Sequence, residues 1–351
     1  MVEGRSQDGL RRLIATHSDA IRVCRVLCIV PVAYVHVSLG EFHSPVGAAV
    51  RSVLRDLLGR SSVLLLSVVS GLLMVRVFAS RGYGAAVWGR VRGLVVPMVA
   101  WNAIALALMW KLGRPLPDDW VNALFAVSDH GATRPLTFLR DLFAVSLLTP
   151  VFVWAMRRAG LWVLVPLLLA GGFVSTKPVI AHSQIVSYFA VGVGFAVLQL
   201  ERTRWVRWGA AAAPWLLLVL AVLSGLRPLV GAPLAFMDAN AFDALVRRPV
   251  CAASFWVLSV RLVRWEGLRT AVVRWFEPAI FAMFLSHSIV LQLLRMGFIA
   301  TRVRHPAAGL LVWVVLPFVA LAVAVGIQRL LSRGPNVLHQ LLLGKPKPST
   351  P

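Results

Sequence analysis

Long apolar runs alternate with short polar segments along almost the whole chain of 351 residues. A helix that crosses a lipid bilayer needs about 20 mostly apolar residues. By this measure the sequence predicts ten spanning helices, at roughly residues 22–40, 61–79, 93–112, 138–156, 160–176, 183–200, 208–226, 248–264, 278–299 and 308–331. The fifth is the weakest of these, because Gly171 and Gly172 interrupt it. The pattern therefore predicts an all-α, polytopic bundle of about ten transmembrane helices.

The composition agrees with this pattern and excludes several classes of protein. Hydrophobic residues make up 59% of the chain and charged residues 14%, and the mean hydropathy is +0.79. In a typical soluble chain roughly half of the residues are hydrophobic and roughly a quarter are charged. The composition excludes a soluble enzyme, a disordered protein and a DNA-binding module with a single membrane anchor.

The charge is strongly positive, with 36 Lys and Arg against 14 Asp and Glu and a formal net charge of +22. A nucleic-acid-binding protein gathers its basic residues in one patch or tail. Here they recur in short clusters between the apolar runs, which is typical of the cytoplasmic loops of a membrane protein. We therefore expect membrane lipids, and no nucleic acid, among the partners. With the N-terminus placed in the cytoplasm most Lys and Arg fall on the inner side, so the sequence predicts two cytoplasmic ends.

These patterns divide the chain into a cytoplasmic N-terminal segment (1–20), a transmembrane domain (21–332) and a cytoplasmic C-terminal tail (333–351). No short apolar segment with a small-residue cleavage site follows the polar N-terminus, so no removable signal peptide is predicted. Two outer connections are long, at 113–137 and 227–247. The first contains a short apolar stretch that we expect to lie along the membrane surface or to dip into it.

The first predicted span carries three polar side chains on one face. At about 100° per residue, the eleven residues from Arg25 to His36 turn the helix only about 20° past three full turns, and Arg22 lies within about 40° of the same direction. A rise of about 1.5 Å per residue puts His36 about 16 Å beyond Arg25, towards the outer half of the membrane. Either arginine alone is also what a positive-inside anchor looks like, and a buried histidine can be a packing residue. Ionisable groups inside a membrane are costly and usually functional, and the shared face favours function.

Chemistry gives this arrangement a use. A histidine inside the membrane is disfavoured as a cation, so His36 should be neutral near neutral pH. A neutral imidazole can accept the proton of a hydroxyl that attacks an acyl group, as a general base does. Arginines at the inner end, Arg22 and Arg25, can bind phosphates through charge-assisted hydrogen bonds. A phosphorylated acyl carrier that enters from the cytoplasm would then present its acyl group near His36.

Further candidates lie at the ends of later spans. Arg90 and Arg92 precede the third span and are further phosphate-binding candidates; they point about 200° apart if they are helical, and Pro97 predicts a kink or a late helix start there. Arg140 and Asp141 begin the fourth span on the outer side. We expect this pair either to bind a sugar or to pair with another loop. The ninth span carries His287 on an otherwise apolar helix, at the end of the segment Phe-Leu-Ser-His. These residues complete the predicted site.

Several catalytic motifs are missing from the sequence. It contains no HExxH, GxSxG, P-loop or aspartate-rich phosphate motif, which argues against a metalloprotease, a serine hydrolase and an ATPase. The three cysteines form no CxxC motif, and Cys24 and Cys28 lie four apart on one helical face, which favours packing over a disulfide. No metal ion is predicted.

The order of these motifs resembles the acyltransferase-3 family over about residues 20–330. The resemblance rests on Arg25 followed by His36, on the segments VVSGLLM, RVRGLVVP, PLTFLRDLFAVSLLTP, SYFAVGVGFAV and AIFAMFLSHSIVL, and on their spacing. Members of this family are polytopic enzymes of the bacterial inner membrane that move acyl groups, commonly acetyl from acetyl-CoA, onto extracytoplasmic sugars. The resemblance implies that His36 is the catalytic histidine and Arg25 its partner. The family's RxxR pair falls near Arg90, but here the spacing is RxR.

The resemblance therefore implies a membrane O-acetyltransferase that takes acetyl-CoA from the cytoplasm and modifies a glycan, free or lipid-linked, on the outer side. Its catalytic residues would be His36 and Arg25. The predicted donor-binding residues are Arg22, Arg90 and Arg92, and the predicted acceptor-binding residues are Arg140, Asp141 and His287. A transporter or flippase of a lipid-linked glycan would share the spans and the buried charges, without needing the spacing of Arg25 and His36. An N-acyl transfer, a longer acyl donor and a transient acyl-histidine remain open at this point.

Overall fold

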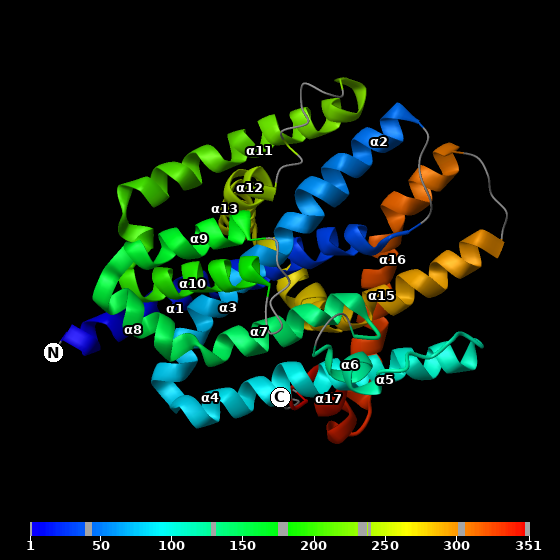
Figure 1. Ribbon diagram of the computed structural model, residues 1–351, viewed down its shortest axis with the longest axis horizontal. Coiled ribbons are helices and arrows are strands. Elements are labelled where there is room, and N and C mark those ends of the chain that lie inside the picture. The colour runs from blue at the N-terminus through cyan, green and yellow to red at the C-terminus, as the bar shows by residue number, and fades with distance from the viewer. Residues whose placement is uncertain are drawn as a thin grey trace.

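The protein is a bundle of helices, as the computed structural model shows for residues 2–38, 44–127, 131–174, 182–230, 237, 240–300 and 306–347 (Figure 1). No strand occurs among these residues, which confirms the all-α prediction. In chain order the helices that overlap the ten predicted spans are α1 (Val2–His36), α3 (Arg60–Arg81), α5 (Val96–Lys111), α7 (Thr137–Leu147) with α8 (Thr149–Ala159), α9 (Leu164–Phe173), α10 (Ser183–Leu198), α11 (Arg204–Val230), α13 (Arg248–Leu262), α15 (Glu277–Ala300) and α16 (Pro306–Arg333).

Shorter helical pieces extend or connect these helices. They are α2 (Pro45–Arg51), η1 (Ser52–Gly59), α4 (Tyr83–Arg90), η2 (Val91–Val95), α6 (Trp120–Phe125), η3 (Arg134–Leu136), η4 (Gly160–Val163), η5 (Leu200–Arg202), α12 (Asn240–Phe242), η7 (Asp243–Arg247), α14 (Glu266–Ala271), η8 (Val272–Phe276) and α17 (Asn336–Leu343). Among them η1, η2, η7 and η8 are π-helical turns that continue directly into a longer helix.

Six stretches of the described chain are long and apolar enough to cross a membrane, judged by length and composition. They are Pro45–Arg81, Tyr83–Lys111, Thr149–Phe173, Arg204–Val230, Glu266–Phe298 and Ala307–Arg333. Ten spans and two cytoplasmic ends therefore stay predictions. Within the third stretch Gly160 has a φ of +59° and ends α8, so the chain turns there as the predicted boundary between the fourth and fifth spans requires.

Local sequence explains two departures from simple helices. Pro97 has no N–H to donate to the preceding turn, and the helix opens into the π-helical turn η2 just before α5 begins at Val96. The predicted late start is wrong, because α4, η2 and α5 form one continuous stretch from Tyr83 to Lys111, and the proline is accommodated by the π-helical turn instead. In the outer connection, Asp119 caps α6 by accepting the backbone N–H of Asn122 at 2.8 Å, and the helix exposes Trp120 and Phe125.

The centre of the bundle is the crossing of α3 and α10. A Cβ on Gly71 of α3 would overlap the carbonyl oxygen of Phe189, and a Cβ on Gly192 of α10 would overlap that of Val68. Small residues let two helix backbones approach this closely inside a membrane. The crossing thus explains the glycines in the second and sixth predicted spans, and it fixes the framework on which the outer ends of α1 and α15 are mounted.

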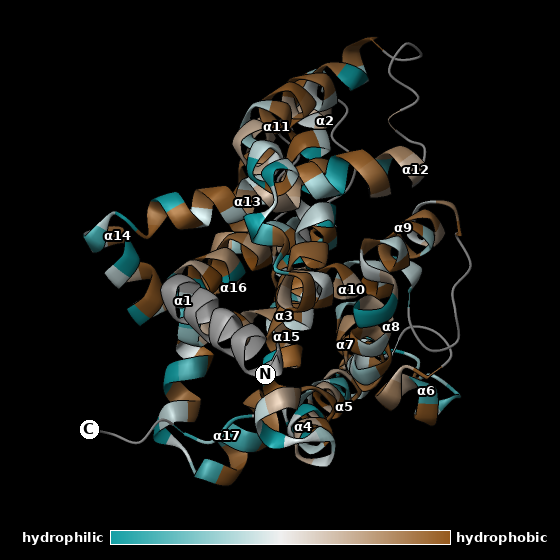
Figure 2. Ribbon diagram, turned by 90° about the vertical axis from the view of Figure 1, so that its left-hand side faces the viewer, coloured by the Kyte–Doolittle hydropathy of each residue, from teal (hydrophilic) through white to brown (hydrophobic). Residues whose placement is uncertain are grey.

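The surface of the bundle is apolar along the long helices. Trp154, Trp162, Trp205 and Trp215 each expose more than 60% of their surface. Figure 2 shows the same trend, with hydrophobic colouring along α11 and α13 and hydrophilic residues on α14 and α17. Lipid tails are the environment that such a surface fits. The three cysteines are free and buried, so the predicted packing role of Cys24 and Cys28 is confirmed.

Replacing Gly192 by Ala should destabilise the protein by about 1–3 kcal/mol, because an added methyl group forces the two backbones apart. Thermal unfolding of the purified protein in detergent measures this loss. Gly326→Ala on α16 is the matched control, since its Cβ would meet no atom within 4 Å. Equal melting temperatures for the two variants would show that the close crossing is not required.

Candidate active site

Helices α1 and α15 run side by side in the same direction and meet at two points. At the end that the charge pattern predicts to be cytoplasmic, here named the inner end, Arg25 Nη1 donates to Glu277 Oε1 at 2.8 Å. Towards the outer end, the rings of His36 and His287 lie with their centroids 5.1 Å apart at an interplanar angle of 56°. The spacing of Arg25 and His36 on α1 is therefore matched by that of Glu277 and His287 on α15.

The hydrogen bonds of His287 define its tautomer. Its Nδ1 lies 2.8 Å from the carbonyl oxygen of Phe284 and 3.1 Å from that of Met283, and both oxygens can only accept. Nδ1 therefore carries a hydrogen, and in the neutral ring Nε2 keeps its lone pair. Nε2 is buried and has no hydrogen-bond partner among the described residues. The ring thus brings an unused acceptor beside His36.

Two arginines that the sequence did not single out act on His36. Arg55 lies on η1, which packs against α1, and Arg134 lies on η3, which packs against α15. Their charges are the cationic charges that reach His36 within the described chain. Arg134 lies in a predicted outer connection and Arg55 in the stretch Pro45–Arg81 ahead of the predicted second span, where a charged residue in one sequence looks like an ordinary loop residue. Their positive charge would favour negative charge that develops on an oxygen near His36.

The other predicted arginines of the inner side point to different neighbours. Arg22 Nη1 lies 3.6 Å from Asp19 Oδ1 in a largely exposed pair one turn away. Arg90 turns into the bundle, with Nε 3.3 Å from the sulfur of Met74 on α3. Arg92 is exposed and its guanidinium lies 4.9 Å from the centroid of the Trp88 ring. The structure therefore brings Arg22 and Arg25 to one helix face and directs Arg90 and Arg92 apart.

Asp141 is completely buried, and both of its oxygens are engaged. Oδ1 accepts from Arg140 Nη2 at 2.6 Å and from Nε at 2.9 Å, while Oδ2 lies 2.5 Å from His182 Nδ1. Arg140 also donates to the carbonyl oxygens of Ala126 and Val127. The structure shows contact of this pair with another connection, through His182, and its contact with a sugar stays a prediction. His182 was not among the predicted residues, and its side chain is 43% exposed.

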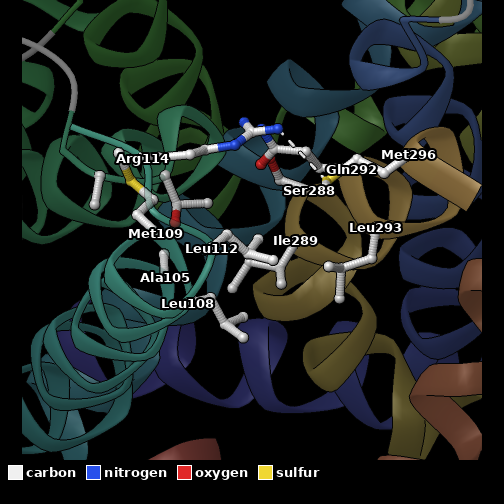
Figure 3. Close-up of a pocket in the computed structure, with 12 residues that line it drawn as sticks. Ala105, Leu108, Met109, Leu112, Arg114, Ser288, Ile289, Gln292, Leu293 and Met296 are labelled. Carbon is white, nitrogen blue, oxygen red and sulfur yellow. Dashed lines mark hydrogen bonds between the residues drawn. The ribbon is translucent and has the colours of Figure 1, made fainter. Parts of the chain in front are cut away.

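A small open cavity of about 50 Å³ lies between α5 and α15 at the ends that are predicted to be outer (Figure 3). Its polar lining residues are Arg114, Thr133, Ser288 and Gln292, and the remainder of the wall is formed by Leu, Met, Ile and Ala side chains. Ser288 directly follows His287 and Thr133 directly precedes Arg134 in the chain, whereas neither imidazole lines the cavity itself. Buried Asn102 fixes this wall, since its Nδ2 donates to Leu124 O at 2.8 Å and its Oδ1 accepts from Thr133 N at 3.1 Å.

The arrangement combines three chemical capabilities. An imidazole with a second imidazole beside it can accept and pass on a proton. Arginines on the inner side can bind an anionic ligand, and an outer cavity with hydroxyl, amide and guanidinium groups can bind a polyhydroxylated one. The arginines that can bind an anion and the cavity that can bind a polyhydroxylated ligand lie at opposite ends of the α1–α15 pair.

Comparison with known proteins agrees with this geometry. Residues 18–329 match the acyltransferase domain family Acyl_transf_3. A stretch of 164 residues is 29% identical to the succinoglycan biosynthesis protein ExoH of Rhizobium meliloti (strain 1021), covering 41% of this chain and 44% of that protein, which is less than half of its length. No solved structure matches the sequence significantly. Since the family match covers most of the chain and all the helices described above from α1 to α16, the protein belongs to the acyltransferase-3 family of multi-pass membrane proteins.

Proposed function

We propose that the protein is a membrane O-acetyltransferase that moves an acetyl group from cytoplasmic acetyl-CoA to a hydroxyl of an extracytoplasmic glycan. The observation that carries the proposal is the imidazole pair, in which His36 lies beside a buried ring with a free Nε2 lone pair.

The reaction needs one proton transfer in each direction. His36 accepts the proton of the glycan hydroxyl while the oxygen of that hydroxyl bonds to the thioester carbonyl carbon. When the carbon–sulfur bond breaks, the imidazolium returns the proton to the leaving thiolate. The lone pair on His287 Nε2 can accept an N–H of His36 and so orient the ring, as the partner of a catalytic imidazole does in other enzymes. Arg55 and Arg134 favour the negative charge on the carbonyl oxygen.

The donor requires cations at the inner end, because CoA carries a diphosphate and a further phosphate. Arg25 uses one N–H for Glu277, and guanidinium groups offer five donors, so it retains N–H groups for a phosphate. Arg22 lies on the same helix face, and Arg92 is exposed at the start of the third span. This division places anionic donor groups on the side that the charge distribution predicts to be cytoplasmic.

The acceptor side is supported by the outer cavity and by the relative. The cavity offers hydroxyl, amide and guanidinium groups for sugar hydroxyls and apolar walls for sugar faces. The name of the relative refers to biosynthesis of succinoglycan, and a polysaccharide or its lipid-linked precursor is the acceptor that we propose here. A bacterial inner membrane is the location that fits these substrates.

Substituting His36 by Gln should lower acetyl transfer about 10²–10⁴-fold, because removing a general base typically costs that much in rate. The acetyl content of surface polysaccharide from cells that carry each variant, measured by mass spectrometry, reports the effect. Ser38→Ala, at an exposed position two residues further on, is the control and should transfer like the wild type. Wild-type acetylation by a well-folded His36→Gln protein would refute the catalytic assignment. If the glycan mass is the same in cells with and without the folded wild-type protein, the flippase is favoured.

A second pair of variants separates the buried ion pair from the cavity. Asp141→Asn removes the buried carboxylate charge that Arg140 and His182 contact and should destabilise the protein by about 3–5 kcal/mol, as breaking a buried ion pair does. Gln292→Ala should lower transfer without changing thermal stability, because it removes a group at the cavity wall. Melting temperatures and transfer rates of the two proteins are compared. If Asp141→Asn melts like the wild type and only transfer falls, Asp141 contacts the acceptor directly.

A further inference from the structure

The C-terminal tail folds back onto the inner end of the bundle. Trp101 Nε1 of α5 donates to the carbonyl oxygen of Leu342 at 3.0 Å, and Leu343 is buried. Beyond α17, Gly344 has a φ of +66° and lies so close to η2 that a Cβ would come within 2.7 Å of Gly93 Cα. Figure 1 shows α17 next to α5. The tail is thus a fixed part of the structure, and it lies beyond the residues that match the family.

Buried His339 fixes the backbone of Lys345, the residue that follows Gly344. Its Nδ1 lies 2.9 Å from the carbonyl oxygen of Lys345, and its Nε2 lies 3.4 Å from Gln328 Nε2 on α16. Since a carbonyl oxygen can only accept, Nδ1 donates, and Nε2 accepts from the amide. The backbone of Lys345 is therefore held between α16 and η2, and its direction out of the tail is set by contacts on both sides.

The side chain of Lys345 is exposed at this end of the bundle, within reach of the charges of α1 and α15. The charges of Arg25, Glu277 and Arg22 all act on its ammonium group. Desolvation and the charge of Arg25 lower the pKa of Lys345, and the opposing effect of Glu277 is smaller. Its side chain still reaches the surface. The ammonium therefore lies in a positive field that an anion from the cytoplasm would neutralise.

The balance of charge in this cluster favours an anion. Arg22, Arg25 and Lys345 face the carboxylates of Asp19 and Glu277, so the cations outnumber the carboxylates by one. Arg92 adds an exposed cation, and its backbone oxygen would lie 2.8 Å from a Cβ on the Gly344 that precedes Lys345. Helix α1, the π-helical turn η2 and the tail thus contribute cations to one end of the bundle.

We propose that the tail forms one wall of the donor site and that Lys345 binds a phosphate group of CoA together with Arg22 and Arg25. This inference rests on the proposed function, because it takes the donor to be a CoA thioester. A lysine is suited to this contact, since its compact charge and three donors can follow a phosphate without fixed bidentate geometry. Phosphates of anionic lipid headgroups have the same chemistry, so the test must separate the two sources.

The test is titration of the full-length protein, in nanodiscs of neutral phosphatidylcholine, with CoA and with CoA lacking its 3′-phosphate. Lys345→Ala should bind CoA about tenfold more weakly, which corresponds to about 1.4 kcal/mol. Lys345→Arg should restore most of the affinity because the charge is kept. Lys347→Ala is the matched control with unchanged affinity, since its Nζ donates to the carbonyl oxygen of Gly334 at 3.2 Å. A smaller effect of Lys345→Ala on the ligand without the 3′-phosphate would identify that phosphate as the contact.

Three outcomes would overturn the inference, and they are distinguishable. If the wild type binds CoA and Lys345→Ala binds it equally well, the tail is not part of the donor site and the proposed function is unaffected. If Lys345→Ala loses only co-purified anionic lipid, the cluster binds headgroups instead. If the wild type itself does not bind CoA, the proposed donor is wrong and the assignment of Lys345 fails with it. Melting temperatures of the ligand-free variants should be equal, because the contacts that hold the tail come from Leu342 and His339.

Discussion

The pairing of α1 with α15 determines where every part of the proposed reaction takes place. Two contacts hold this pair, the Arg25–Glu277 ion pair at the inner end and the His36–His287 ring contact towards the outer end. Because both helices run in the same direction, a shift of one against the other would separate both contacts at once. A single rigid register therefore carries an anion-binding end and a proton-transfer end through the bundle, at the distance that eleven residues of helix provide.

The placement of charge follows from the cost of burying it. Ionised groups inside a membrane are retained only with a partner, and the described chain shows three such arrangements. Glu277 neutralises part of the charge of Arg25, Asp141 is held by Arg140 and His182, and Asp243 binds the guanidinium groups of Arg247 and Arg248 at 2.6 and 2.5 Å. The imidazole pair is different, since His287 satisfies only Nδ1 and leaves Nε2 without a partner within the described chain. An unsatisfied buried acceptor costs free energy, which is the reason to assign it a function.

How much of this could be predicted from sequence depends on whether a relation lies within one segment. The common face of Arg25 and His36 follows from helix geometry alone, whereas the close crossing at Gly71 and Gly192 was not predicted. The contacts between α1 and α15 join residues about 250 positions apart, and no periodicity relates two separate helices. For the same reason Asp141 was recognised as a polar contact, but the sequence could not choose between a sugar and His182. Lys345 looked like an ordinary cytoplasmic cation, because only the fold of the tail brings it to Arg25.

The central claim is that an acetyl group crosses from the inner to the outer face through the α1–α15 pair while the glycan stays on its own side. The most direct measurement uses the full-length protein oriented in proteoliposomes, with isotope-labelled acetyl-CoA only on the face that carries Arg22 and Arg25. The glycan acceptor is placed only on the opposite face. Labelled acetyl groups should appear on the glycan, and this should require His36. Appearance of unmodified glycan on the acetyl-CoA side, without any need for acetyl-CoA, would contradict the account and identify a flippase.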